Sequence, residues 1–251
     1  MRHPMPPPPS PASDWAWFLD VDGTLIDIAP TPSAIHIPPA MPGLLSALAF
    51  RFGGAVALVS GRTLDNIRML VAPFRPPAAG MHGLERVTAG GVVIRPSEAS
   101  GLDDIRDRLR IFATAHEGVI IEDKGLTLAL HYRLAPACED SARRAVEDSV
   151  SRHPAFRMLA GKMVFEIAPA GCDKGTAVRA FMDEPPFAGR IPVFVGDDVT
   201  DEHGFAAVND MGGVSILVGE ERATAARFRL ADVGACQAWL AEAAGTAWGG
   251  R

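Results

Sequence analysis

Two aspartates near the N-terminus interrupt a stretch that otherwise has the composition of a buried strand. Residues 15–25 read WAWFLDVDGTL, so Asp20 and Asp22 are separated by a single valine. A buried carboxylate without a partner costs several kcal/mol, and a cation is therefore expected close to this pair. Because residues two apart in a strand point to the same side, both carboxylates can face that cation if the strand conformation continues.

Polar residues follow other apolar runs in the same way. The run at 54–60 (GAVALVS) ends in Ser60, the run at 191–197 opens the acidic string GDDVTDE, and Lys174 begins a helical stretch before that run. In an open α/β sheet, ligands bind beyond the carboxyl ends of the strands. We therefore expect these side chains to converge on Asp20 and Asp22, together with the acidic residues of the string, Asp197, Asp198 and Asp201.

Such a cluster suits a divalent cation and a phosphoryl group. Mg²⁺ prefers hard oxygen ligands, which here are Asp20, Asp22 and Asp197. The Lys174 ammonium, the Ser60 hydroxyl and backbone amides around Gly23-Thr24 would suit phosphoryl oxygens. Each motif alone also has a structural interpretation, as a turn, a helix cap, a solvated lysine or an acidic helix N-terminus. Their combination at strand ends favours a functional site.

The elements that must position these residues alternate along the chain. Short apolar runs bounded by Gly, Asp or Ser predict buried strands at 15–21, 54–60, 78–83, 191–197 and 214–219. Helices are expected between them, at 41–52, 63–71, 173–182 and 200–208. This alternation predicts an α/β fold with a Rossmann-like, doubly wound parallel-sheet core.

The middle of the chain has a different pattern, with adjacent strands joined by tight turns. A hairpin at 86–96, helices near 101–116 and 136–152, and strands at 118–124, 126–133, 155–160 and 162–168 predict an antiparallel sheet with helices on one face. We therefore predict a disordered Pro-rich tail at 1–14, a catalytic core at 15–85 and 169–251, and an inserted α+β cap domain at 86–168.

Composition narrows the class of protein. The net charge of −6 argues against a nucleic-acid surface, and no apolar run is long enough to cross a membrane. The three cysteines are odd in number, far apart and not spaced as metal ligands, which is typical of a reduced, cytoplasmic protein. Only three of the 24 basic residues are lysines, Lys124, Lys162 and Lys174, so these positions are candidates for a specific need for ammonium.

The strings DVDGT and SGR, Lys174 and GDDVTDE together resemble the four motifs of the haloacid dehalogenase superfamily. This resemblance implies phosphoryl transfer through an aspartyl-phosphate on Asp20, with Asp22 as the general acid and base. It implies a phosphate site formed by Thr24, Ser60 and Lys174. It also implies a Mg²⁺ ion held by Asp20, Asp197 and the backbone carbonyl of Asp22. An insertion between the Ser60 and Lys174 motifs is typical of the sugar phosphatases in this superfamily.

Three charged residues of the cap extend the resemblance. Glu122 and Lys124 are two apart on a predicted strand, and Glu166 lies on a neighbouring one. Two carboxylates around an ammonium suit the recognition of sugar hydroxyls, which need both acceptors and donors. An exposed ion pair is the simpler interpretation, although lysine is scarce in this chain. The cap strings, MHGLE at 81–85 and the DDVTDE form of the last motif are similar to those of trehalose-6-phosphate phosphatases. That resemblance implies a sugar site of Glu122, Lys124 and Glu166, with His82 and Gly83 nearby.

The expected activity is thus Mg²⁺-dependent hydrolysis of trehalose 6-phosphate, with a trehalose-6-phosphate synthase as a possible partner in the same pathway. Two alternatives remain open from the sequence. The same chemistry could act on another sugar phosphate, or the chain could be a catalytically silent sugar-phosphate-binding domain. The presence of Asp22 disfavours the silent domain, because a binding module has no use for an acid-base residue.

Overall fold

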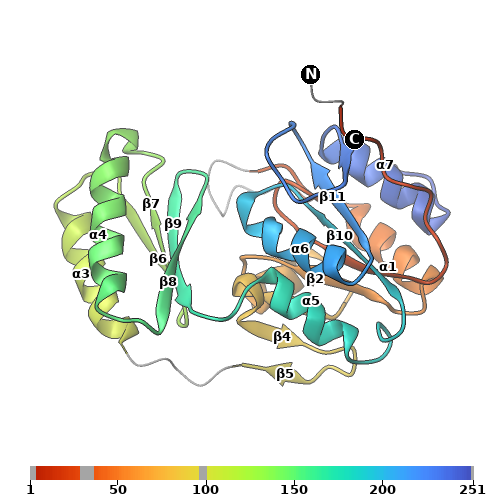
Figure 1. Ribbon diagram of the computed structural model, residues 1–251, viewed down its shortest axis with the longest axis horizontal. Helices are drawn as coiled ribbons and strands as arrows, with labels where there is room; N and C mark the ends of the chain where they lie inside the picture. The colour runs from red at the N-terminus through yellow and green to blue at the C-terminus, as the bar shows by residue number, and fades with distance from the viewer. Residues whose placement is uncertain (1–3, 29–36, 96–100, 250–251) are drawn as a thin grey trace. The chain divides into compact units, whose positions relative to one another are not determined.

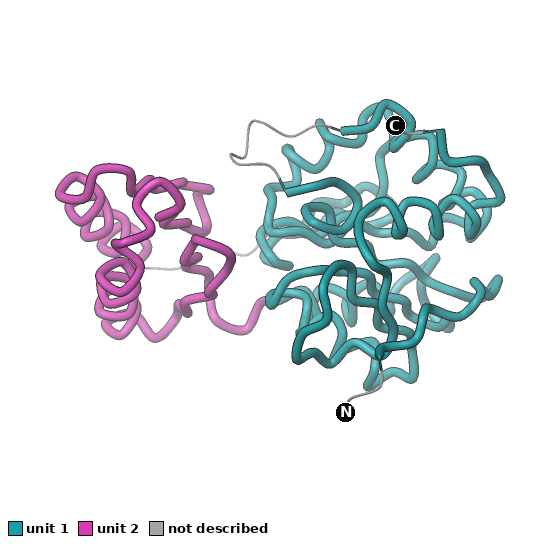
Figure 2. Tube along the Cα trace, turned by 90° about the horizontal axis from the view of Figure 1, so that it is seen from above, with its two compact units in different colours: residues 1–94, 173–251 teal, residues 95–172 magenta. Residues whose placement is uncertain are grey.

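The computed structural model describes residues 4–28, 37–95 and 101–249. Contacts between residues divide the chain into two compact units. Unit 1 comprises residues 1–94 and 173–251, and unit 2 comprises residues 95–172 (Figure 2). None of the helices among the described residues is long and apolar enough to cross a membrane.

An eight-stranded sheet forms the centre of unit 1 (Figure 1). Its spatial order is β12 (Phe228–Leu230), β11 (Val214–Val218), β10 (Ile191–Gly196), β1 (Trp15–Leu19), β2 (Val56–Val59), β3 (Ala78–Gly80), β4 (Glu85–Val87) and β5 (Val93–Ile94). The strands from β12 to β3 are parallel to one another, whereas β4 and β5 pair in antiparallel fashion.

Helices cover both faces of this sheet, as the alternation of elements predicts. One face packs against α1 (Met41–Arg51), α2 (Leu64–Leu70) and α7 (Val233–Ala244), and the other against α5 (Lys174–Met182) and α6 (Glu202–Asp210). Short 3-10 helices are η1 (Met81–Gly83) and η3 (Val199–Asp201). In β1, Trp15, Trp17 and Leu19 enter the first apolar cluster, while Ala16 and Phe18 enter the second. The strand is therefore buried on both faces, and its carboxyl end is held rigidly.

Unit 2 is a smaller α+β structure. Its four-stranded antiparallel sheet has the order β6 (Ile120–Asp123), β7 (Leu128–His131), β9 (Val164–Pro169) and β8 (Phe156–Gly161). The helices α3 (Leu102–Thr114) and α4 (Glu139–Ser151), the latter preceded by η2 (Pro136–Cys138), share one apolar cluster with this sheet. Leu128, Leu130, Phe165 and Ile167 alternate into that cluster, so the intervening residues of β7 and β9 lie on the opposite face.

The boundary between the units differs from the sequence-based expectation, which gave residues 86–168 to the cap. Strand β4 pairs with β3 through Ala78, Ala79 and Gly80, and β5 pairs with β4, so both extend the sheet of unit 1. The predicted hairpin is confirmed by the antiparallel pairing of β4 and β5, but local sequence does not reveal which sheet a hairpin joins. The sequence pattern also left β12 and α7 unpredicted.

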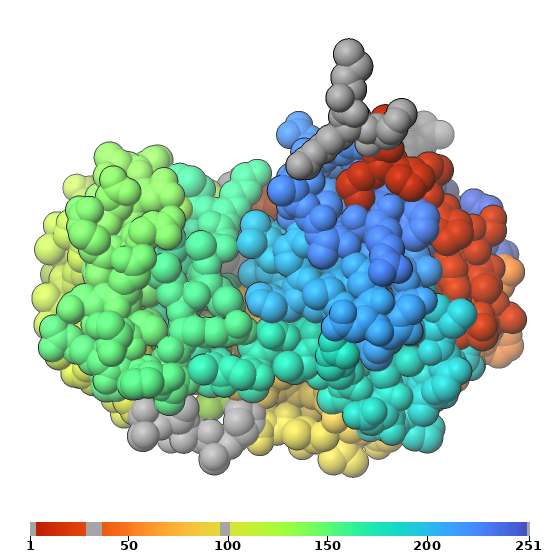
Figure 3. Space-filling model, in the orientation of Figure 1, coloured from red at the N-terminus to blue at the C-terminus, as the bar shows by residue number. Residues whose placement is uncertain are grey.

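The Pro-rich N-terminal segment also differs from the expected disordered tail; residues 1–3 of that prediction lie outside the described part. The Met5 amide donates to Glu221 Oε1 at 2.7 Å, and the Pro6 carbonyl accepts from the Arg229 amide at 3.0 Å. Met5 packs against the second apolar cluster of unit 1. Figure 3 shows this segment, in red, lying against C-terminal residues in blue. Composition gave no sign of these partners.

The packing around β1 gives a stability prediction. Phe18 is fully buried, and its ring centroid lies 5.4 Å from that of Phe187 and 6.0 Å from that of Phe181. Phe18→Ala should lower the free energy of unfolding by about 3–5 kcal/mol, because a cavity would replace the ring. Phe50, 91% exposed, provides the control, since Phe50→Ala should change stability by less than about 0.5 kcal/mol. Urea unfolding of both variants tests this, and equal losses would contradict the described packing.

Candidate active site

The predicted site residues of unit 1 gather at one edge of the large sheet. Asp197, Asp20 and Ser60 directly follow β10, β1 and β2, and η1 with His82 and Gly83 directly follows β3. These four strands are consecutive neighbours and run parallel, so their carboxyl ends meet. Lys174 is the first residue of α5, which begins with a capping box at Asp173. The structure thus brings together most of the residues that the motifs predict.

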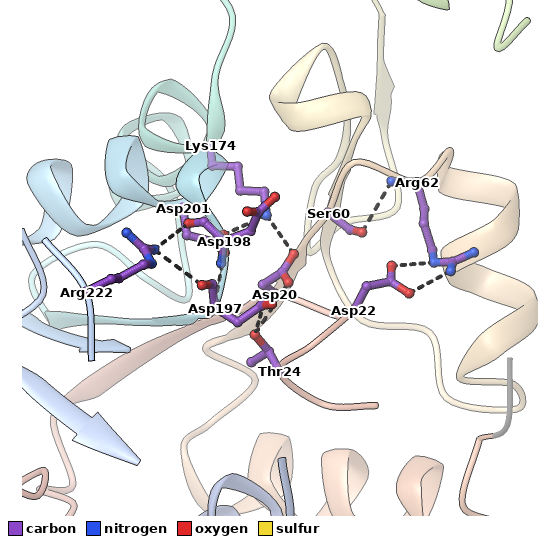
Figure 4. Close-up of polar contacts among 10 residues, drawn as sticks. All are labelled: Asp20, Asp22, Thr24, Ser60, Arg62, Lys174, Asp197, Asp198, Asp201 and Arg222. Atoms are coloured by element: carbon purple, nitrogen blue, oxygen red, sulfur yellow. Dashed lines mark hydrogen bonds and ion pairs between the residues drawn. The ribbon is translucent and has the colours of Figure 1, made fainter. Parts of the chain in front are cut away.

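A buried lysine links two carboxylates at the centre of this edge (Figure 4). Lys174 Nζ lies 2.7 Å from Asp20 Oδ1 and 2.6 Å from Asp201 Oδ1, and all three residues are less than 5% exposed. The second carboxylate oxygen of Asp201 accepts the backbone amides of Asp197 and Asp198 at 3.0 and 2.9 Å. Asp201 therefore fixes both the ammonium and the start of the acidic loop, a role that its position in GDDVTDE did not reveal.

A tight loop after β1 brings a threonine to the same cluster. The Thr24 hydroxyl donates to Asp20 Oδ2 at 3.4 Å and lies 3.5 Å from Asp197 Oδ1. Gly23 has φ +80°, and a Cβ atom there would lie 2.0 Å from Asp197 Oδ2. Only glycine therefore allows the loop and the Asp197 carboxylate to approach so closely.

The charges of this cluster do not balance. Burial raises the pKa of Asp20 well above its usual range, and attraction to Lys174 only partly opposes the shift. Burial, together with repulsion from Asp201, raises the pKa of Asp197 to about 7. Burial alone would lower the pKa of Lys174, but the carboxylates of Asp20 and Asp201 outweigh it and raise that pKa. One ammonium therefore faces three carboxylates, and a further cation would stabilise their ionised forms.

The donor set fits a divalent cation. Asp20, Asp197 and Asp201 each offer a carboxylate oxygen, and these three oxygens lie within 4.8 Å of one another. All are hard oxygen ligands of the type that Mg²⁺ prefers. Asp201 already accepts from Lys174 and two backbone amides, so Asp20 and Asp197 are the better candidates for direct ligands.

Asp22 points away from this cluster, in contrast to the expectation that both aspartates face one direction. Strand β1 ends at Leu19, and the Gly23 amide donates to the Ile26 carbonyl within a tight loop, so the strand geometry does not continue. The two carboxylate oxygens of Asp22 accept from Nε and Nη2 of Arg62, both at 2.6 Å (Figure 4). Arg62 belongs to the predicted SGR motif, but its pairing over 40 residues was not foreseen.

Residues 81–83 form a strained turn beside Ser60. Met81, His82 and Gly83 have φ values of 47°, 56° and 100°, and a Cβ atom at Gly83 would lie 2.4 Å from the Asp173 carbonyl oxygen. The His82 amide donates to the Ser60 carbonyl at 2.9 Å, and the Ser60 hydroxyl accepts the Arg62 amide at 3.2 Å. Two non-glycine residues in the left-handed region are typical of functional sites, where surrounding contacts maintain the strain.

The three predicted sugar-binding residues share one face of the unit 2 sheet. Glu122 and Glu166 both pair with Ala129, one from each side, and Ala129 lies on the face opposite the helices. Lys124 Nζ lies 3.3 Å from Glu166 Oε1, so an ion pair is present, but its side chains are only 10% and 18% exposed, unlike the exposed pair of the simpler interpretation. Glu122 Oε2 lies 3.0 Å from His131 Nε2, and this bond is the main cause of the lowered pKa of Glu122. The result is a row of acceptors and donors on the sheet face opposite the helices.

Comparison with known proteins gives a consistent result. Residues 18–234 match the family model described as trehalose-phosphatase. The chain is 45% identical over 207 residues to a probable trehalose-phosphate phosphatase of Sinorhizobium fredii, covering 82% of this chain and 78% of the relative. It is 41% identical over 243 residues to the trehalose-6-phosphate phosphatase of Escherichia coli K12, covering 96% and 90%.

Solved structures show the same fold. The C-terminal domain of the trehalose-6-phosphate phosphatase of C. albicans superposes with a TM-score of 0.84 at 20% identity, covering 94% of this chain and 93% of that one. A trehalose-6-phosphate phosphatase related protein superposes with a TM-score of 0.76 at 27% identity, covering 91% and 96%.

The raised pKa of Asp197 gives a prediction for the metal-free protein. Between about pH 4 and pH 7 the folded state binds more protons at this carboxyl than the unfolded state does, so its contribution to stability falls as the pH rises. Asp197→Asn does not ionise, and its stability relative to the natural chain should rise by about 2–4 kcal/mol over that range. Unfolding in EDTA at several pH values measures this difference.

Asp65, with a side chain 76% exposed, supplies the control for that experiment. The stability difference between Asp65→Asn and the natural chain should stay nearly constant over the same pH range. A constant difference for Asp197→Asn as well would show that burial does not disfavour its charge.

Proposed function

The chain belongs to the trehalose-phosphatase family, and we propose that it hydrolyses trehalose 6-phosphate to trehalose and inorganic phosphate through a covalent intermediate on Asp20. The observation that carries this proposal is the buried contact of Lys174 with Asp20 at the carboxyl end of β1, beside Asp197. A carboxylate placed there can act on a phosphorus atom, whereas a binding module would have no need to bury it among like charges.

In the first step, an Asp20 carboxylate oxygen attacks phosphorus, the bond from phosphorus to the sugar oxygen breaks, and that oxygen takes a proton. In the second step, water attacks phosphorus, loses a proton and releases phosphate from Asp20. Lys174 orients the nucleophile and offsets the charge of the phosphoryl oxygens. Thr24 and Ser60 are buried hydroxyl residues beside Asp20 and Arg62 respectively, and we assign them to the remaining phosphoryl oxygens.

Asp22 is the group we assign to proton transfer in both steps. Its side chain is 32% exposed, in contrast to the buried Asp20, and Arg62 fixes its orientation through two hydrogen bonds. We infer that Asp22 exchanges this partner for the leaving oxygen and then for the attacking water. General acid-base catalysis of this kind contributes about 10²–10⁴-fold to a rate.

Mg²⁺ is the cofactor that we propose. Asp20, Asp197 and the backbone carbonyl of Asp22 would hold it, while Asp201 orients the acidic loop. When bound, the ion would neutralise charge on the phosphoryl group and on the aspartates. The hard oxygen donors and the raised pKa values of Asp20 and Asp197 support this assignment.

The sugar is assigned to unit 2. Glu122 and Glu166 offer carboxylate acceptors on the same sheet face, and Lys124 offers a donor between them in sequence. Sugar hydroxyls need both kinds of partner, so this row suits a polyhydroxylated leaving group. His82 and Gly83, in the strained turn of unit 1, are further candidates for contacts with the substrate.

Replacement of the nucleophile should separate the covalent mechanism from alternatives. Asp20→Asn should abolish phosphate release from trehalose 6-phosphate, because an amide cannot form the acyl-phosphate, and it should leave the fold intact. Phosphate release and circular dichroism measure the two effects. Asp183, at the C-terminus of α5, gives a control, since Asp183→Asn should retain nearly full activity. A folded Asp20→Asn protein with near-normal turnover would refute the role of Asp20.

Substitutions in unit 2 should alter substrate choice more than chemistry. Glu122→Ala and Glu166→Ala should each lower kcat/KM for trehalose 6-phosphate by about 5- to 150-fold, because sugar hydroxyls would lose their partners. Hydrolysis of p-nitrophenyl phosphate, which lacks the sugar, should hardly change. The ratio of the two kcat/KM values is therefore the quantity to measure.

The exposed Glu147 of α4 provides the matched control within the same unit. Glu147→Ala should leave the ratio at the value of the natural chain. If Glu122→Ala and Glu166→Ala also leave it there, these residues do not form the sugar site.

A further inference from the structure

We propose that Arg222 is a positioning residue for the metal ligand Asp197, an inference that rests on the function proposed above. Arg222 lies in the chain segment between β11 and β12, outside every motif that the sequence presents. Strand β11 is parallel to β10, so this segment leaves the sheet at the same edge as the acidic loop. Figure 4 shows Arg222 on one side of Asp197 and Asp198, with Asp20 on the other.

The guanidinium holds the backbone of the acidic loop directly. Nη2 of Arg222 donates to the carbonyl oxygen of Asp198 at 2.8 Å and to that of Asp197 at 3.3 Å. The amides of the same two residues donate to Asp201. The peptide groups that carry the Asp197 side chain are thus held from two sides, by a carboxylate on their N–H groups and by a guanidinium on their carbonyl groups.

Glu202 fixes the guanidinium in turn. Its Oε1 accepts from Nη1 of Arg222 and from the Thr224 hydroxyl, the latter at 2.8 Å, and its Oε2 accepts the Ala225 amide at 2.7 Å. The side chains of Arg222 and Glu202 are only 27% and 26% exposed. Arg222 therefore has one nitrogen for Glu202 and another for the loop, an arrangement that needs the planar fork of arginine.

Two possible roles of Arg222 predict opposite changes in metal affinity when this residue is removed. If Arg222 acted only through its charge, it would repel a cation at Asp20 and Asp197, and removing it would tighten binding. If Arg222 positions Asp197, removing it should weaken binding, since residues that orient metal ligands typically contribute about 10–100-fold to metal affinity or activity. The sign of the change therefore distinguishes the two roles.

The test measures Mn²⁺ binding by electron paramagnetic resonance, and Mg²⁺ dependence of p-nitrophenyl phosphate hydrolysis, in the full chain. Arg222→Met should raise the dissociation constant for Mn²⁺ and the half-saturating Mg²⁺ concentration by about 10-fold or more. Arg222→Lys, which keeps the charge but not the fork, should show a smaller increase. Arg179→Met, which removes a guanidinium from an exposed pair with Asp210, should change neither value.

Thermal unfolding in EDTA separates a positioning role from a general loss of stability. A positioning role predicts that the metal-free Arg222 variants have a Tm close to that of the natural chain. If Arg222→Met fails to fold, Arg222→Lys decides by the same measurements. Unchanged or tighter metal binding in a folded Arg222 variant would overturn the positioning role while leaving the proposed function intact. Failure of the natural chain itself to bind Mn²⁺, with Asp197→Asn as the reference, would overturn the metal site and this inference together.

Discussion

The contact of one buried ammonium with two buried carboxylates is the interaction on which the rest of the site depends. Lys174 joins the end of β1, through Asp20, to the loop after β10, through Asp201. Without it, two buried carboxylates would lie in the same cluster with no cation to offset their charge, which is strongly disfavoured. The same contact aligns α5 with the sheet edge, so the N-terminus of that helix, the two strand ends and the strained turn at 81–83 form one connected frame.

Around this centre, successive hydrogen bonds and an ion pair connect the charged residues to the acidic loop. Asp201 holds the amides of the acidic loop, Arg222 holds its carbonyl groups, and Glu202 holds Arg222. Asp20 and Asp197 direct carboxylate oxygens into the cluster and are not held by the loop amides as Asp201 is, and burial raises the pKa of both. Backbone groups and ion pairs thus hold the acidic loop in place, while Asp20 and Asp197 give the cluster a local excess of negative charge. That excess favours a divalent cation, which when bound would neutralise charge on the aspartates and on a phosphoryl group.

The sequence was sufficient to predict the doubly wound core and most of the residues at its carboxyl edge, because strand and helix periodicity are local properties. The common direction expected for Glu122 and Lys124 likewise follows from the two-residue period of strands, whereas Glu166 joins that face through its pairing with Ala129. Long-range pairing was not accessible in this way. The direction of Asp22 depends on Arg62, the attachment of β4 and β5 depends on β3, and the role of Arg222 depends on two loops brought together only by the sheet.

The contacts of the N-terminal segment limit where the protein can be truncated or fused to a tag. The Met5 amide is bound by Glu221, the residue immediately before Arg222, and Pro6 is bound to Arg229 of β12, the strand that follows the same loop. A boundary chosen from composition alone would discard these prolines as dispensable. Such a truncation, or a bulky fusion attached at this end, would remove contacts that hold the loop carrying Arg222 and the strand after it. Purification tags are therefore better placed where they leave residues 4–14 undisturbed.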